Sequence, residues 1–260
     1  MAYNAFDLTG KVALVTGGNG GIGLGMADAI AQAGGDVCIW GTNNTKNAAA
    51  VEQLKAHGTR VSSLNCNVTD EAEVKDCFAE TLSQYGRVDG CFANAGVSSG
   101  KKSFLDIDDA EWQRVLSVNL DGVFYTFQAA TKHMVERAKN GDLGGRLVGT
   151  ASLAAISGAA RNEHYAATKG GVISMIRALA VEFARYDITA NAILPGWIET
   201  AMTENAMNWQ KFSDAVKPRI PAGRWGKPED FGGTAVYIMS GASSYHTGDT
   251  FLIDGGYFLF

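Results

Sequence analysis

Short apolar runs alternate with longer segments of helical periodicity along almost the whole chain, and this alternation constrains the fold more than any other feature. The run 11–17, "KVALVTG", precedes a helical segment from Ile22 to Ala33, and the run 36–41, "DVCIWG", precedes another from Asn47 to His57. Runs that are apolar on both faces are typical of parallel strands covered by helices on each side of a sheet. The sequence therefore predicts an α/β fold.

The same pattern continues to the C-terminal end of the chain. Further strands are expected within 60–68, 88–96, 145–152, 188–196 and 250–256. A long helix is expected from about Asp109 to Ala138, and another contains Tyr165. Right-handed crossovers would wind about seven strands and six helices into a doubly wound sheet. Ligands of such a sheet bind beyond the carboxyl ends of its strands.

Length and composition favour a single domain spanning residues 1–260. With 260 residues, of which 46% are hydrophobic, the chain can bury one substantial core. No linker, repeat or low-complexity run indicates a second domain. The segment 199–225 has weaker periodicity and is expected to form a mobile lid over the substrate site.

The charge and cysteine content exclude several classes of partner. A net charge of -5 argues against nucleic acid, which is bound mainly through clustered Lys and Arg. No stretch approaches the roughly 20 apolar residues of a membrane span, so no membrane is expected as a partner. Cys38, Cys66, Cys77 and Cys91 show no CxxC spacing, which favours reduced thiols and a cytoplasmic location. No metal is expected.

A glycine-rich loop joins the first strand to the first helix. The residues "TGGNGGIG", 16–23, let the backbone turn tightly and approach a pyrophosphate, whose charge the helix N-terminus stabilises. The loop therefore predicts a dinucleotide site, and its context of strand before and helix after strengthens that prediction.

The end of the second strand bears on the choice between NAD and NADP. An acidic residue there would bind the ribose 2′-hydroxyl, and an arginine would accept a 2′-phosphate. Gly41 stands at that place, and Gly20 adds no basic side chain from the first loop. The missing carboxylate removes repulsion against NADP, while Thr42, Asn43 and Lys46 can hydrogen-bond either form. We expect NADP or NAD, with NADP favoured.

Several polar residues follow the remaining strands in a fixed order. "NAG", 94–96, ends the fourth strand, Ser152 ends the fifth, and Asn119 lies in "SVNLDG" on the helix between them. Tyr165 and Lys169 are four residues apart in one helix, a spacing that is common and proves nothing alone. The ordered set TGxxxGIG, NAG, Asn, Ser, YxxxK and PG, however, resembles the short-chain dehydrogenase/reductase family over essentially the whole chain. The resemblance is to its single-domain branch and implies a Rossmann fold.

The resemblance implies a catalytic tetrad of Asn119, Ser152, Tyr165 and Lys169. Tyr165 would be the acid/base, because a lysine ammonium and a positive nicotinamide lower the pKa of a phenol from its usual value of about 10. Lys169 would also bind the nicotinamide ribose, and Ser152 would hold the substrate oxygen. The backbone at Asn119 is expected to hold a water that links Lys169 to solvent.

The resemblance also assigns the cofactor contacts. Asn67 replaces an aspartate that commonly contacts adenine, and the turn "LPGWIET", 194–200, is expected to fix the carboxamide and expose the B face of the nicotinamide. The expected contacts are Gly17, Asn19, Gly21, Ile22, Gly23, Thr42, Asn43, Asn67, Val68, Asn94, Ala95, Gly96, Tyr165, Lys169, Pro195, Gly196, Ile198 and Thr200.

The expected substrate pocket is mostly apolar. Its residues are Ser98, Ser152, Leu153, Ala154, His164, Trp197 and Met202. Such a lining predicts a small cyclic or aromatic secondary alcohol or ketone.

Four other functions compete with this one. The C-terminal half also resembles 3-oxoacyl-carrier-protein reductases, although an acidic carrier needs a basic patch that the acidic chain hardly offers. A sugar or polyol dehydrogenase is a further alternative, and a cofactor-binding sensor is disfavoured because all four tetrad members are present. A serine hydrolase is excluded because no GxSxG surrounds Ser152.

The apolar end "YFLF", 257–260, is a surface that a monomer rarely leaves uncovered. The resemblance implies a symmetric homotetramer, in which Phe260 is expected to reach a neighbouring subunit's pocket.

Overall fold

Seven parallel strands form the centre of the computed structural model, which describes residues 4–99, 101 and 103–260. The strands are β1 (Val12–Thr16), β2 (Asp36–Gly41), β3 (Val61–Asn65), β4 (Gly90–Ala93), β5 (Gly145–Thr150), β6 (Ile188–Pro195) and β7 (Thr250–Ile253). Their order is β3-β2-β1-β4-β5-β6-β7, and every neighbouring pair is parallel. The chain reverses its direction of winding between β1 and β4, which places the expected ligand crevice at their carboxyl ends. The predicted doubly wound fold is confirmed.

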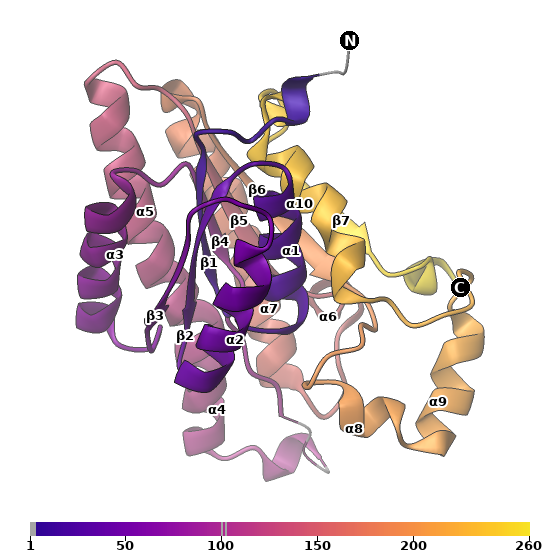
Figure 1. The fold of residues 1–260 in the computed structure, drawn as a ribbon. Coiled ribbons are helices and arrows are strands. Elements are labelled where there is room, and N and C mark those ends of the chain that lie inside the picture. The colour runs from indigo at the N-terminus through magenta and orange to yellow at the C-terminus, as the bar shows by residue number, and fades with distance from the viewer. Residues whose placement is uncertain (1–3, 100, 102) are drawn as a thin grey trace.

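Helices cover both faces of this sheet (Figure 1). They are α1 (Gly21–Gln32), α2 (Asn44–Lys55), α3 (Glu71–Tyr85), α4 (Asp109–Leu116), α5 (Gly122–Lys139), α6 (Ala154–Ser157), α7 (Glu163–Phe183), α8 (Glu204–Met207), α9 (Gln210–Val216) and α10 (Gly232–Met239). Alternate residues of each strand point to opposite faces. Leu14 therefore packs in one core with α3, α5 and α7, and Val15 packs in the other with α1, α2 and α10.

Two boundaries differ from the sequence prediction. Helix α2 begins at Asn44, three residues early, because the Asn43 side chain accepts a hydrogen bond from the Lys46 amide at 3.0 Å and caps the first turn. The long helix expected from Asp109 to Ala138 is divided by a π-helical turn, Ser117–Asp121, into α4 and α5. Such turns insert one residue and often mark functional sites.

The segment 199–225 contains α8, α9 and a short 3₁₀ helix, Lys217–Arg219. An apolar cluster of its own anchors it, with Trp197 and Trp225 packed around Phe212. In Figure 1 these helices project from the sheet beside its carboxyl edge. Within the described part of the chain, no helix combines the length and the apolar character that crossing a membrane requires.

Candidate active site

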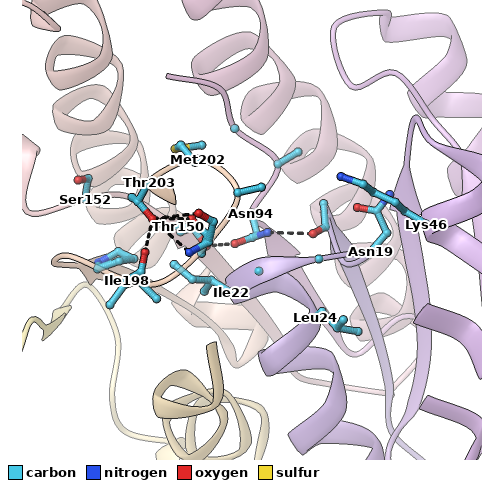
Figure 2. A pocket seen from close by; sticks show the side chains of 18 of the residues that line it. Asn19, Ile22, Leu24, Lys46, Asn94, Thr150, Ser152, Ile198, Met202 and Thr203 are labelled. Carbon is cyan, nitrogen blue, oxygen red and sulfur yellow. Dashed lines mark hydrogen bonds between the residues drawn. The ribbon is translucent and has the colours of Figure 1, made fainter. Parts of the chain in front are cut away.

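A cavity of about 570 Å³ lies at the carboxyl ends of the strands, where the sequence predicts the ligand site (Figure 2). It is lined by Gly17, Asn19, Gly20, Gly21, Ile22, Leu24, Lys46, Ala49, Ala50, Gln53, Asn94, Ala95, Gly96, Thr150, Ala151, Ser152, Tyr165, Lys169, Pro195, Gly196, Ile198, Thr200, Ala201, Met202 and Thr203. These described lining residues include two lysines and no carboxylate. The cavity therefore suits an anionic ligand.

The glycine loop forms a cradle that fits a pyrophosphate. Gly17 has a φ of 64°, and a Cβ on it would lie 3.0 Å from the Ala95 Cα. A Cβ on Gly23 would overlap the Gly17 carbonyl oxygen. Gly20, the N-cap of α1, makes no side-chain cap, so the first-turn amides are available to an anion. The residues present therefore fit a dinucleotide cofactor.

Three side chains brace this cradle against the centre of the sheet. The Thr16 hydroxyl accepts hydrogen bonds from the amides of Asn94 and Ala95, both at 3.0 Å. Asn94 Nδ2 donates to the Thr16 carbonyl at 3.1 Å, and Thr150 Oγ1 donates to Asn94 Oδ1 at 3.1 Å. Sequence reasoning missed Thr16 and Thr150, although each is the last residue of its strand.

Lys169 lies beneath Tyr165 on helix α7. Its ammonium donates to the Thr150 carbonyl at 2.7 Å and lies 5.5 Å from the centre of the Tyr165 ring. Burial lowers the pKa of Lys169 to about 8, because removal from water disfavours the charged form.

The surroundings of Tyr165 within the protein act on its pKa in two opposing ways, and the lowering expected beside a nicotinamide stays a prediction. Burial raises the pKa of the phenol, and a hydrogen bond with Ser152 opposes this rise. The expected lowering depends on a nearby ammonium and a positive nicotinamide. In the structure the Lys169 ammonium is bonded to the Thr150 carbonyl, so desolvation has the larger effect on Tyr165.

Asn119 is buried in the π-helical turn and faces the loop that follows β4. Its Oδ1 accepts from the Val97 amide at 2.8 Å, and its Nδ2 donates to the Val97 carbonyl at 2.9 Å. The Nδ2 also lies 3.4 Å from Thr168 Oγ1 on α7. The side chain thus ties the loop after "NAG" to the helix that carries Tyr165.

Five expected cofactor residues do not line this cavity: Gly23, Thr42, Asn43, Asn67 and Val68. Gly23 instead packs against Gly17 and Asn94 behind the loop. Asn43 caps α2, and Asn67 Oδ1 accepts from the amide and hydroxyl of Thr69 at 3.2 and 2.9 Å. The contacts that would involve these side chains stay predictions.

Among the expected substrate residues, Ser152 and Met202 line the cavity. Ser98 accepts a hydrogen bond from Asn162 Nδ2 at 2.8 Å. His164 is buried, with Nε2 3.5 Å from Glu111 Oε1 on α4. Trp197 packs against Phe212 in the apolar cluster of 199–225, and Leu153 and Ala154 lie at the start of α6, where Leu153 is buried.

Helix α2 and the start of the segment 199–225 contribute lining residues that sequence reasoning did not assign to the site. These include Gln53 on α2 and Ala201 and Thr203 after the PG turn. The Thr203 hydroxyl donates to the Ile198 carbonyl and accepts from the Thr200 amide at 3.1 Å. The sequence did not predict this turn, because the segment has weak periodicity. Threonine hydroxyls can nevertheless hydrogen-bond the backbone of a turn.

The chain is similar over nearly its full length to known dehydrogenases and reductases. Residues 17–258 match the family model described as Enoyl-(Acyl carrier protein) reductase. The chain is 35% identical to 2-dehydro-3-deoxy-D-gluconate 5-dehydrogenase of Escherichia coli (strain K12), covering 99% of each. It is 36% identical to a 3-oxoacyl-[acyl-carrier-protein] reductase of Chlamydia pneumoniae, covering 96% of this chain and 97% of that protein. A solved gluconate 5-dehydrogenase from Burkholderia cenocepacia J2315, in complex with NADP and tartrate, superposes with a TM-score of 0.92 at 32% identity over 99% of this chain and 98% of that one.

Proposed function

The chain belongs to the short-chain dehydrogenase/reductase family and is an oxidoreductase of that type, and on this premise we propose that it interconverts a secondary alcohol and a ketone with NAD(P). The observation that carries the proposal is the convergence of Ser152, Tyr165 and Lys169 with the glycine cradle on one cavity. A hydride donor and a proton donor are both required to reduce a carbonyl, and this cavity can hold one beside the other.

The glycine cradle and the turn at Pro195 and Gly196 would hold NAD(P), whose nicotinamide would supply or accept the hydride. Tyr165 gives its proton to the carbonyl oxygen during reduction, while the Ser152 hydroxyl donates to the same oxygen and holds it in place. Burial raises the pKa of Tyr165, and a hydrogen bond with Ser152 opposes that rise. Lys169 lies one turn from Tyr165 on α7, and its pKa of about 8 lets it gain or lose a proton near physiological pH.

The comparisons favour a sugar acid and do not support the cyclic or aromatic substrate expected from the sequence. Relatives from several bacteria are named for gluconate or a dehydro-deoxy-gluconate. We therefore infer that the substrate is a polyhydroxylated acid or its keto form. A cavity lined by no carboxylate among its described residues supports this, because an anionic substrate meets no like charge.

Reduction of a 3-oxoacyl thioester is the second candidate. The observation that favours it is the 36% identity with the reductase of Chlamydia pneumoniae, which is similar to that with the gluconate enzymes. We rank it second because the chain is acidic overall, with a net charge of -5.

NADP is the proposed cofactor form. Asp and Glu are absent from the described cavity lining, and Lys46 lies at its α2 end (Figure 2). A 2′-phosphate there would meet a cation and no like charge.

The test is a panel of 5-ketogluconate, acetoacetyl-CoA and cyclohexanone, each with NADPH and with NADH. We expect the highest kcat/KM for 5-ketogluconate with NADPH. A preference for acetoacetyl-CoA would support the second candidate. Turnover confined to cyclohexanone would contradict the sugar-acid proposal, and a strong NADH preference would contradict the cofactor assignment.

A further inference from the structure

The end of β2 carries no side chain at Gly41, and two asparagines fill the space that one would occupy. A Cβ on Gly41 would overlap Asn19 Nδ2 and would lie 2.7 Å from Asn47 Oδ1. Asn19 Nδ2 donates to Asn47 Oδ1 at 2.6 Å, and the buried Asn47 donates to the Gly41 and Leu64 carbonyls at 2.8 and 3.3 Å. Hydrogen bonds from Asn47 therefore hold the Asn19–Asn47 pair against the backbone at the end of β2.

The asparagines that follow this strand are committed to local structure. Asn43 Oδ1 caps α2 by accepting from the Lys46 amide at 3.0 Å. Asn44 Oδ1 and the Thr42 carbonyl both accept from Asn65 Nδ2, at 2.7 and 3.2 Å. None of 42–44 lines the cavity, and none of them carries a charged side chain.

Lys46, in contrast, faces the cavity from the first turn of α2. It shares a helix face with Ala49, Ala50 and Gln53, all of which line the cavity. Figure 2 shows its side chain beside that of Asn19. The other lining lysine, Lys169, is bonded to Thr150 beneath Tyr165. Among the described residues, no carboxylate lies within ion-pair distance of Lys46, although Lys55 on the same helix pairs with Glu52 at 3.1 Å.

We propose that Lys46, on helix α2, binds the 2′-phosphate of NADP(H). The Asn19–Asn47 pair fills the space at Gly41 in which a side chain at the end of β2 would otherwise distinguish NADP from NAD. The proposal rests on the proposed cofactor-dependent function. It assigns to one exposed and otherwise unpaired cation a contact that an unphosphorylated ribose cannot make.

The first test replaces Lys46→Gln and, as a matched control on the same helix, Lys55→Gln. Dissociation constants for NADPH and NADH are measured by fluorescence titration of the folded enzyme without substrate, so the result does not depend on turnover. We expect K46Q to weaken NADPH binding about tenfold or more, the usual loss for a charge-assisted hydrogen bond. NADH binding should change less than twofold, K46R should restore NADPH binding, and K55Q should alter neither.

Several outcomes would overturn the assignment. They are equal losses for both cofactors in K46Q, no loss for either, or tighter binding of NADH than of NADPH by the unmodified protein. The last of these would also refute NADP preference, whereas normal binding with no turnover of any ketone would refute only the proposed reaction.

A second test probes the asparagine pair. Gly41→Asp alone must displace Asn19, whereas Asn19→Ala together with Gly41→Asp leaves room for the carboxylate. We expect the double variant to shift the NADH to NADPH affinity ratio further toward NADH than the two single effects multiplied together. A strictly multiplicative result, with all variants folded by thermal melting, would show that Asn19 does not occupy that place.

Discussion

Lys169 is the residue whose surroundings differ most from those of an ordinary lysine. It is 3% exposed, and its ammonium donates to the Thr150 carbonyl. The sequence predicted its place beneath Tyr165 from the four-residue spacing, because that spacing fixes which side chains share a helix face. It did not predict the bond to Thr150, since that contact depends on how closely α7 packs against β5.

Burial of this ammonium makes the stability of the protein depend on pH. The pKa of Lys169 is lowered from 10.5 to about 8, so between these values the unfolded chain binds more protons than the folded one. Stability from this group therefore rises as pH increases through that window, and the full penalty applies below pH 8.

Replacing Lys169→Met removes the penalty and tests this sign. The difference in unfolding free energy between K169M and the unmodified protein should favour K169M more at pH 7 than near pH 10.5. The change in this difference should be at most about 3 kcal/mol. Urea unfolding at both pH values measures the difference. A difference between the two proteins that does not change with pH would contradict the burial account.

At the scale of elements, the strands and the doubly wound sheet were predicted, whereas the division of the long helix and the short helices of 199–225 were not. Each strand is an apolar run closed by glycine or a polar residue, and parallel strands bring their carboxyl ends, with Ser152 and "NAG", to one edge. The π-helical turn that carries Asn119 adds one residue without disturbing the apolar pattern, so the sequence predicted one continuous helix. Helices α8 and α9 are too short to give a clear period.

The Thr203 hydroxyl holds the turn at the start of the segment 199–225, and Thr203→Val tests its role. The Thr203 hydroxyl bonds the Ile198 carbonyl and the Thr200 amide, and both groups border the cavity. Valine keeps the shape but leaves these groups unpaired, so we expect NADPH to bind several-fold more weakly. Thr203→Ser retains the hydroxyl and should bind as the unmodified protein does. Equal behaviour of the two variants would show that the hydroxyl is not needed.

At the scale of the whole molecule, an apolar end lies beside an edge strand. Leu259 and Phe260 are 85% and 77% exposed, and β7 is the last strand of the sheet. Arg219 contacts both the first and the last residue of 257–260. It donates to the Tyr257 hydroxyl at 3.0 Å and to the Phe260 carbonyl at 3.2 Å. An ordered apolar surface of this kind supports the proposed homotetramer.

Deleting 258–260 should therefore lower the assembled mass. Light scattering after size exclusion should show a shift from a tetramer toward dimers or monomers, and KM should rise if Phe260 reaches a neighbour's pocket. Leu143→Ser, at an exposed leucine elsewhere on the surface, is the control and should leave the mass unchanged. Unchanged assembly and kinetics in the truncated protein would refute the role of this end.

The substrate was harder to predict from the sequence than the fold or the reaction. It predicted an apolar pocket, of which Ser152 and Met202 line the cavity, whereas His164 lies near Glu111 and Trp197 packs against Phe212. Motifs at the ends of strands can be recognised in the sequence because their spacing is fixed, whereas the residues of 199–225 follow no clear period.

Tyr165→Phe tests the central claim most directly, because it removes one hydroxyl and leaves the cavity otherwise intact. Reduction of 5-ketogluconate with NADPH is followed by the loss of nicotinamide absorbance, and NADPH affinity is titrated separately. The account predicts that kcat falls by about 10² to 10⁴, the usual contribution of a proton donor, while the NADPH dissociation constant stays within about twofold. Turnover that survives in Y165F with NADPH binding unchanged would contradict the assignment of Tyr165 as the acid/base.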